Sequence, residues 1–198
     1  MSARIFLEGG GNSKELNIRC REGFRKLFAK CGFEGRMPTL IPGGGRNDVL
    51  ADFARALRSH GERDFVALLI DSETPPQDIE ATWQHLQGQR LTKPTDATDE
   101  QLLFMTTCME TWIVADRSAF SAHFGNTSRD SALPSLHDLE SRLPVELFGA
   151  LRKATSGCRQ PYAKGAVSFL LLGKLSPNEL ERHLPSFRRI VRILQARL

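Results

Sequence analysis

The 198-residue sequence lacks the features that mark several large classes of protein. Its four cysteines form no Cys-x-x-Cys pair, and no histidine pair stands near them at zinc-ligand spacing. No stretch approaches the ~18 consecutive apolar residues of a membrane span, and no cationic segment with a long apolar core opens the chain. We therefore expect a cytoplasmic protein with no membrane association, whose cysteines are reduced packing residues: Cys20, Cys31, Cys108 and Cys158.

The sequence motifs of several common catalytic sites are also missing. Gly9-Gly10-Gly11 is not followed by the third spaced glycine of a dinucleotide-binding turn. Neither this run nor Gly43-Gly44-Gly45-Arg46 ends in the Gly-Lys-Ser/Thr of a phosphate-binding P-loop. The chain has no Gly-x-Ser-x-Gly elbow and no His-Glu-x-x-His pair, which argues against the commonest serine hydrolases and zinc proteases.

The composition that remains is that of an ordinary globular protein. Apolar residues make up 40% and charged residues 25%, so the chain can bury a core and has no bias toward disorder. The formal net charge of +4 favours a polyanionic partner only mildly, because many proteins that never meet nucleic acid carry a similar excess. Only the distribution of this charge can decide between the two cases.

The first half of the chain alternates predicted strands and helices. Apolar runs predict strands over 4–7, 37–41, 65–71 and 101–105, and helical spacing predicts helices over 14–30 and 47–59. Asn12 with Glu15 resembles a capping box at the first helix. The run Phe65 to Asp71 is continuously apolar before its final acid, which predicts a strand buried on both faces of a parallel sheet.

The second half of the chain is predicted to be mainly helical. We expect a polar connection over 72–98 with a short helix over 79–86, a helix over 108–116 and a loop over 125–136. Further helices are expected over 145–154, over 165–172 and from Pro185 or Ser186 onward. In the last helix we interpret Arg188, Arg189 and Arg192 as a solvated face rather than a phosphate-binding patch. The chain is thus predicted to form an α/β core over 1–124 and a helical part over 125–198, packed together as one compact domain.

Acidic residues stand where two predicted strands end. Glu8 closes the first strand, whereas Asp71 and Glu73 follow the third. Functional groups collect beyond the carboxyl ends of parallel strands, so these three side chains are expected to converge. Carboxylates this close repel one another unless a cation offsets their charge, and Mg²⁺ (or Mn²⁺) prefers such oxygen ligands. The alternative is that all three are ordinary strand-end residues or helix caps.

These motifs resemble the Toprim domain, which topoisomerases, primases and overcoming-lysogenization-defect (OLD) nucleases share. The resemblance is carried by Leu7-Glu8-Gly9 and Leu69-Ile70-Asp71-Ser72-Glu73. The sequence is more similar still to the Toprim-like bacterial family catalogued as domain of unknown function 4276. That resemblance covers nearly the whole chain through five motifs in order: Glu8-Gly9-Gly10-Gly11, Gly44-Gly45-Arg46, Asp71-Ser72-Glu73, Met109-Glu110-Thr111-Trp112-Ile113-Val114-Ala115-Asp116 and Tyr162-Ala163-Lys164-Gly165.

The resemblance implies a Toprim-like, Rossmann-like fold and a role for each acid. Glu8 would be a general acid or base, or a metal ligand, and Asp71 with Glu73 would hold Mg²⁺. Glu73 departs from the commoner second aspartate, so a mechanism with two metal ions is less secure than a simple metal site. Lys164 would neutralise charge on the transferred phosphate, or else is a surface lysine before a helix.

Three positions in the glycine turns and one arginine are candidates for binding phosphate. Arg46 follows a glycine run and opens a helix, so its guanidinium and the exposed amides nearby would form an anion cradle. Otherwise Arg46 is a surface arginine in a flexible turn. The predicted phosphate-binding residues are Gly10, Gly44, Gly45 and Arg46.

The motif from Met109 to Asp116 contributes one further candidate ligand. Glu110 and Asp116 lie six positions apart on the predicted helix, on different faces, so one straight helix does not direct both to one ion. We expect Glu110 to join the acidic cluster and Asp116 to cap the following segment. Trp112 is expected to pack in the core rather than to stack on a nucleic-acid base.

The leading expectation is therefore a Mg²⁺-dependent nuclease acting on DNA or RNA. By resemblance it would serve bacterial anti-phage defence beside an ATPase partner, and it is compatible with a homodimer. One alternative is a non-catalytic binding or regulatory subunit with the same fold. Another is a primase-like or topoisomerase-like phosphotransfer activity, although the sole tyrosine, Tyr162, argues against strand passage.

Overall fold

The computed structural model describes residues 2–11, 13–59, 61 and 63–198, and these form an α/β fold around a parallel sheet. The sheet contains four strands, all parallel, in the order β2-β1-β3-β4. Their bounds are β1 (Ala3–Glu8), β2 (Thr39–Gly43), β3 (Phe65–Asp71) and β4 (Leu102–Met105). The predicted fold class, a Rossmann-like parallel sheet flanked by helices with a helical C-terminal part, is confirmed.

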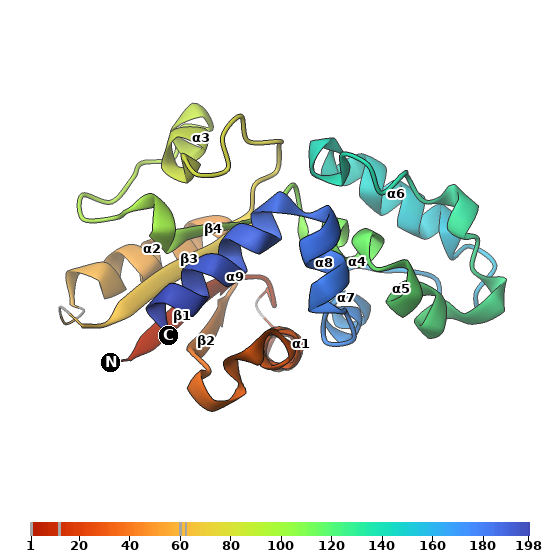
Figure 1. The fold of residues 1–198 in the computed structure, drawn as a ribbon, viewed down its shortest axis with the longest axis horizontal. Coiled ribbons are helices and arrows are strands. Elements are labelled where there is room, and N and C mark those ends of the chain that lie inside the picture. The colour runs from red at the N-terminus through yellow and green to blue at the C-terminus, as the bar shows by residue number, and fades with distance from the viewer. Residues whose placement is uncertain (1, 12, 60, 62) are drawn as a thin grey trace.

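Helices flank the sheet on both faces and continue beyond it. Figure 1 shows α4 to α8 gathered to one side of the sheet, with α9 running back across it. The helices of the described residues are α1 (Lys14–Phe28), α2 (Arg46–Arg58), α3 (Thr82–Gly88), α4 (Met109–Ala115), α5 (Arg117–Phe124), α6 (Pro144–Ala154), α7 (Ala166–Leu172), α8 (Pro177–His183) and α9 (Pro185–Arg197). Among these residues, no helix is long and apolar enough to cross a membrane.

Each face of the sheet has its own hydrophobic core, because successive side chains of a strand point to opposite faces. On β3, Ala67 and Leu69 join the core shared with α1 and α4 to α9, whereas Leu68 and Ile70 join the core under α2 and α3. Trp83 anchors this second core. The predicted burial of β3 on both faces is therefore confirmed.

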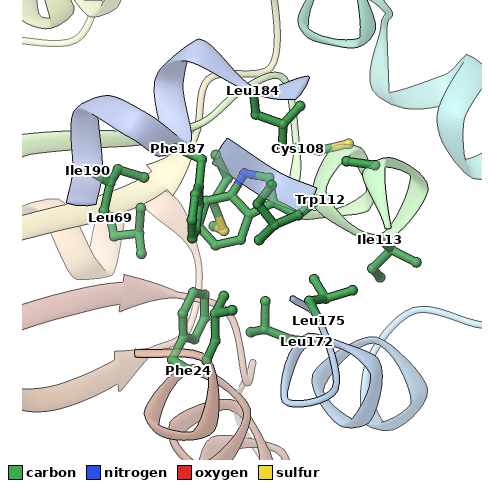
Figure 2. Close-up of a cluster of buried hydrophobic side chains, with 14 of the residues drawn as sticks. Phe24, Leu69, Cys108, Trp112, Ile113, Leu172, Leu175, Leu184, Phe187 and Ile190 are labelled. Atoms are coloured by element: carbon green, nitrogen blue, oxygen red, sulfur yellow. The ribbon is translucent and has the colours of Figure 1, made fainter. Parts of the chain in front are cut away.

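The larger core is built around Trp112 of α4. This side chain has no exposed surface, and its ring meets Phe187 of α9 edge-on with the ring centroids 4.9 Å apart. Phe24 of α1 packs against the same ring at 6.3 Å, as Figure 2 shows. The prediction that Trp112 packs in the core is confirmed, and this one side chain joins the α/β sheet layer to the C-terminal helices.

Element boundaries follow the sequence patterns closely, with physical reasons for the differences. Strand β2 begins two residues later than expected and continues two residues further, through Pro42 and Gly43. Proline is tolerated there because β2 lies at the edge of the sheet. The N-cap of α1 is Ser13, whose side chain accepts a hydrogen bond from the Leu16 amide. The expected cap Asn12 lies outside the described residues.

Two helices, α5 and α8, are absent from the sequence prediction. Each of these two helices buries a single side chain, Phe120 in α5 and Leu180 in α8, so neither shows an apolar period. Their start signals are nevertheless present: Asp116 caps α5, and Pro177 occupies the first turn of α8. The cap predicted at Asp116 is thus confirmed.

One expectation for the last helix is wrong. Arg189 does not face solvent: its side chain is only 4% exposed and lies in a polar contact between α9 and the connection before β4. Its guanidinium donates to the Leu102 carbonyl at 3.0 Å and the Asp99 carbonyl at 2.6 Å, and it pairs with Glu80 at 2.9 Å. The periodicity of the helix does not predict this buried position, because the backbone carbonyls that accept from the arginine lie in another segment and cannot be recognised from the sequence around it.

Candidate active site

The order of the strands places a switch point between β1 and β3. The chain leaves β1 through α1 to the edge strand β2, then crosses by α2 to β3 on the other side of β1. Helices α1 and α2 therefore lie on opposite faces of the sheet. In open α/β sheets, the crevice beyond the strand ends at such a point is the usual place for a ligand. Glu8 and Asp71 end these two strands.

Glu8 and Asp71 lie side by side at this switch point. The Glu8 Oε2 atom accepts a hydrogen bond from the Asp71 backbone amide at 3.1 Å. The Asp71 Oδ1 atom in turn accepts one from the Met109 amide at 2.9 Å, at the start of α4. Of the three acids expected to converge, the structure brings Glu8 and Asp71 together, although 63 positions separate them in the sequence.

Arg46, at the start of α2, holds the acids on one side of the site. Its Nε lies 3.6 Å from Glu8 Oε2 and its Nη2 lies 3.3 Å from Glu73 Oε1, and it also donates to the Asp71 carbonyl. The side chain of Arg46 is 16% exposed, whereas that of Glu73 is 51% exposed. Arg46 is therefore neither free nor flexible, and an incoming phosphate would compete with two carboxylates for it.

Gln89, just after α3, fixes the orientation of Arg46. Its Oε1 accepts from Arg46 Nη1 at 3.0 Å, and its Nε2 donates to the Ser72 carbonyl at 2.8 Å. The Ser72 carbonyl also lies 3.0 Å from His85 Nε2. Sequence reasoning missed Gln89, because it lies in the connection after β3 and no local pattern points to it.

Glu110 and Lys164 lie on the other side of the site. Glu110 is only 2% exposed, and its Oε1 accepts a hydrogen bond from the Tyr162 hydroxyl at 2.8 Å. Lys164 Nζ lies 3.6 Å from Glu110 Oε2, while its side chain remains 56% exposed. The Tyr162 hydroxyl also lies 2.8 Å from Ser168 Oγ. The last motif therefore contributes a buried tyrosine that positions Glu110, a role that sequence reasoning did not assign.

A cavity of about 290 Å³ connects these groups. Its lining includes Glu8, Asp71, Glu110, Lys164 and Gly10. Gly10 has a backbone φ of +83°, and a Cβ there would lie 2.0 Å from the Asn17 Oδ1 atom, so only glycine fits. Glu73, Gly44, Gly45 and Arg46 do not line this cavity. Glu73 itself adopts a left-handed φ of +64°, a conformation that few non-glycine residues hold.

Burial and mutual repulsion raise the pKa values of the acids. The pKa of Asp71 lies well above its usual range because of burial and then because of the charges of Glu8, Glu110 and Glu73. Burial also raises the pKa of Glu8, and Arg46 offsets this only in part. Burial alone would lower the pKa of Lys164, but the charges of Glu110 and Asp71 outweigh it and raise that pKa. The site thus has an excess of negative charge that a cation would neutralise.

The donor set is suited to one kind of metal ion. In the described part of the chain, no three side chains among His, Cys, Asp and Glu are gathered closely enough to hold a metal ion by themselves. Mg²⁺ does not require such a cage, because it is commonly bound by one or two carboxylates together with water and phosphate oxygens. The pair of Glu8 and Asp71 meets that smaller requirement.

One of the four cysteines borders this site: burial and then the charges of Glu110 and Asp71 raise the pKa of the Cys108 thiol. All four are free thiols. Burial raises the pKa of Cys20 and of Cys31 to about 12, so neither is an activated thiolate at neutral pH. Their interpretation as reduced packing residues is consistent with this environment.

Comparison with known proteins identifies the family of the chain. The model of the family described as domain of unknown function (DUF4276) matches residues 7–195. The chain belongs to the DUF4276 family. The match spans all five motifs of this DUF4276 protein and confirms the family resemblance seen in its sequence. No curated protein and no solved structure gives a significant match.

Proposed function

We propose that this DUF4276 protein is a Mg²⁺-dependent (or Mn²⁺-dependent) Toprim-like nuclease that hydrolyses phosphodiester bonds in DNA or RNA. The observation that carries the proposal is the contact between Glu8 and Asp71 at the β1/β3 switch point, inside a cavity that also holds Lys164. Two adjacent carboxylates with raised pKa values form a site whose charge calls for a cation. When bound there, Mg²⁺ would supply neutralising charge to the phosphate undergoing hydrolysis.

The acidic residues of the site would transfer the proton and hold the metal ion. Hydrolysis joins a water oxygen to phosphorus, breaks the bond from phosphorus to the leaving ester oxygen, and moves one proton from the water to the leaving oxygen. Glu8 is the candidate to accept that proton, since its raised pKa brings it closer to neutral pH than an ordinary glutamate. Asp71, with Glu73 as a further candidate ligand, would hold the metal ion.

The two cations would act on the substrate. Lys164 is half-exposed beside the cavity and carries its full charge, so its Nζ can approach a phosphate oxygen as negative charge builds there. Arg46 would turn from Glu8 and Glu73 toward a phosphate, guided by Gln89. Gly10 lines the cavity and packs against Asn17 too closely for a side chain, and it stays a candidate to bind that phosphate through its backbone.

A binding or regulatory subunit without catalytic activity is the second candidate. It is favoured by the existing ion pairs of Arg46 with Glu8 and Glu73, which already neutralise part of the acidic charge without any metal. An ATPase partner and a role in anti-phage defence belong to the proposal through the family resemblance alone. A cytoplasmic location, expected from the sequence, and a homodimer are further parts of the proposal.

An activity assay separates the two candidates. Purified protein is incubated with plasmid, single-stranded DNA and RNA in Mg²⁺, in Mn²⁺ and in chelator, alongside Asp71→Asn. The matched control is Asp52→Asn, an exposed aspartate on α2 that pairs only with Arg55 among the described residues. We expect metal-dependent cutting that Asp71→Asn abolishes and Asp52→Asn retains. Cutting that survives in chelator or in Asp71→Asn would contradict the proposal, and no cutting of any substrate would favour the binding subunit.

A further inference from the structure

One segment of the chain combines a positive excess with few acidic neighbours. The segment from Arg142 to Lys164 carries five of the 27 lysines and arginines but only one of the 23 aspartates and glutamates, which gives it a formal charge of +4. The stretch from Arg182 to Leu198 has five arginines and no acid, but four of these arginines form ion pairs with glutamates elsewhere in the chain. The segment from Arg142 to Lys164 comprises α6 and the connection to α7. Figure 1 shows α6 at an edge of the group of helices beside the sheet.

The cations of this segment are available to a partner. Arg152, Lys153 and Arg159 are all exposed. Within the described residues, none of these three forms an ion pair with an acidic side chain, in contrast to the paired arginines of α9. Exposed cations that no acidic side chain neutralises attract a polyanion.

An aromatic side chain connects this surface to the cavity. The Phe148 ring of α6 has Arg152 Cζ 5.9 Å and Lys164 Nζ 5.7 Å from its centroid. The same ring packs against Tyr162, the tyrosine that hydrogen-bonds to Glu110, with the centroids 6.0 Å apart. Lys164 therefore belongs both to the cavity lining and to the basic surface. The surface continues directly into the candidate active site.

We infer that Arg152, Lys153 and Lys164, together with Phe148, form a docking surface for single-stranded nucleic acid that leads its backbone into the cavity. The inference rests on the proposed function and adds the class of substrate. The cavity of about 290 Å³ lies at the small end of ligand sites, so it admits one nucleotide bent out of a flexible strand. Alternation of cations with a partly exposed aromatic ring is the arrangement that single strands prefer, since their bases are free to stack.

The test measures binding separately from cutting. A fluorescein-labelled single strand of about 20 nucleotides, as DNA and as RNA, and a duplex of equal length are titrated in chelator, with fluorescence anisotropy as the readout. The variant Arg152→Gln with Lys153→Gln removes two exposed cations of α6. The matched control, Arg55→Gln with Arg58→Gln, removes two exposed cations from α2 on the opposite face of the sheet. Melting temperatures verify that both variants fold.

We expect the wild-type protein to bind single strands more tightly than duplex. The α6 variant should bind about tenfold more weakly at low salt, and its log–log salt slope should fall in magnitude by about 1.4, or ~0.7 for each lost phosphate contact. The α2 control should stay within about twofold of the wild type. Equal affinities of the two variants, duplex binding as tight as single-strand binding, or no binding by the wild type would each overturn the inference.

The outcomes also separate this inference from the nuclease proposal. Binding in chelator that depends on Arg152 and Lys153, without cutting in Mg²⁺, would support the surface and contradict the nuclease. Metal-dependent cutting with equal efficiency by the α6 variant and the wild type at low substrate concentration would support the nuclease and overturn the surface.

Discussion

The acidic cavity and the core around Trp112 are neighbouring regions in which burial has opposite effects on stability. In the core, apolar groups are packed without exposed surface, so burial stabilises every member. In the cavity, Glu8, Asp71 and Glu110 bring like charges together, and burial raises the pKa values of Glu8 and Asp71. One helix, α4, supplies both Trp112 and Glu110. The core therefore stabilises the fold, whereas the buried charges of the cavity contribute less to stability than neutral groups in their place would.

The substitution with the largest expected effect should move activity and stability in opposite directions. Asp71→Asn should lower cutting by about 10⁴-fold, which corresponds to ~5.5 kcal/mol in the activation free energy. In chelator it should raise the free energy of unfolding by about 1 kcal/mol, because the amide removes a buried charge and can still accept from the Met109 amide. Cutting assays and urea unfolding check the two parts.

The same comparison predicts that a substitution of Trp112 in the core lowers stability, whereas Asp71→Asn raises it. Trp112→Ala should lower the free energy of unfolding by about 3 to 5 kcal/mol, since it leaves a large cavity among Phe24, Phe187 and their neighbours. Trp112→Phe is the control: it retains a ring and removes an indole N–H that has no hydrogen-bond partner among the described residues. Urea unfolding that gave equal losses for Ala and Phe would contradict this account of the core.

A smaller effect is expected from the residue that positions Arg46. Gln89→Ala should lower kcat/KM about tenfold without a change of fold, because it removes the hydrogen bond that aims the guanidinium. The KM should rise more than kcat falls if Arg46 acts by holding a substrate phosphate. Gln87→Ala, which changes an exposed glutamine in the last turn of α3, is the matched control. Equal kinetics for the two variants would exclude a positioning role.

The pH dependence of stability should distinguish the cavity from the rest of the molecule. Because the pKa of Asp71 is raised on folding, the native state binds the extra proton over the interval between the unfolded and folded pKa values. The free energy of unfolding contributed by this group therefore falls as pH rises through that interval. In chelator, Asp71→Asn should remove this fall. Between pH 4.5 and pH 8, the free energy of unfolding of the variant should then decrease by about 1 kcal/mol less than that of the wild type. Parallel profiles would contradict the assigned burial of charge.

The sequence allowed much of the fold to be predicted because its strands carry distinct signals. The continuous apolar run before Asp71 identified the central strand with its bounds, and the glycine turn after Glu8 identified the switch-point strand. Parallel strands then bring their carboxyl ends together, so the meeting of Glu8 and Asp71 followed from topology alone. Helices α5 and α8 were not predicted because each buries only one side chain, Phe120 or Leu180, and so shows no apolar period.

The supporting residues of the site could not be predicted, for a different reason. Gln89 and Tyr162 act through contacts between segments distant in the sequence, and a hydrogen bond of that kind leaves no local pattern. The same holds for Arg189, whose acceptors are backbone carbonyls of another segment. The ion pairs of Arg46 with Glu8 and Glu73 could not be predicted either, because the glycine turn before Arg46 indicated only that this arginine is free to bind an anion.

The two tryptophans of this chain offer a natural pair of optical reporters. Trp83 lies in the layer beneath α2 and α3, whereas Trp112 lies in the opposite layer and next to Glu110. Emission from a Trp83→Phe variant would therefore report only the side of the sheet that carries the C-terminal helices, and emission from Trp112→Phe only the other side. Stopped-flow traces of the two variants can establish whether the layers assemble in one step or in succession.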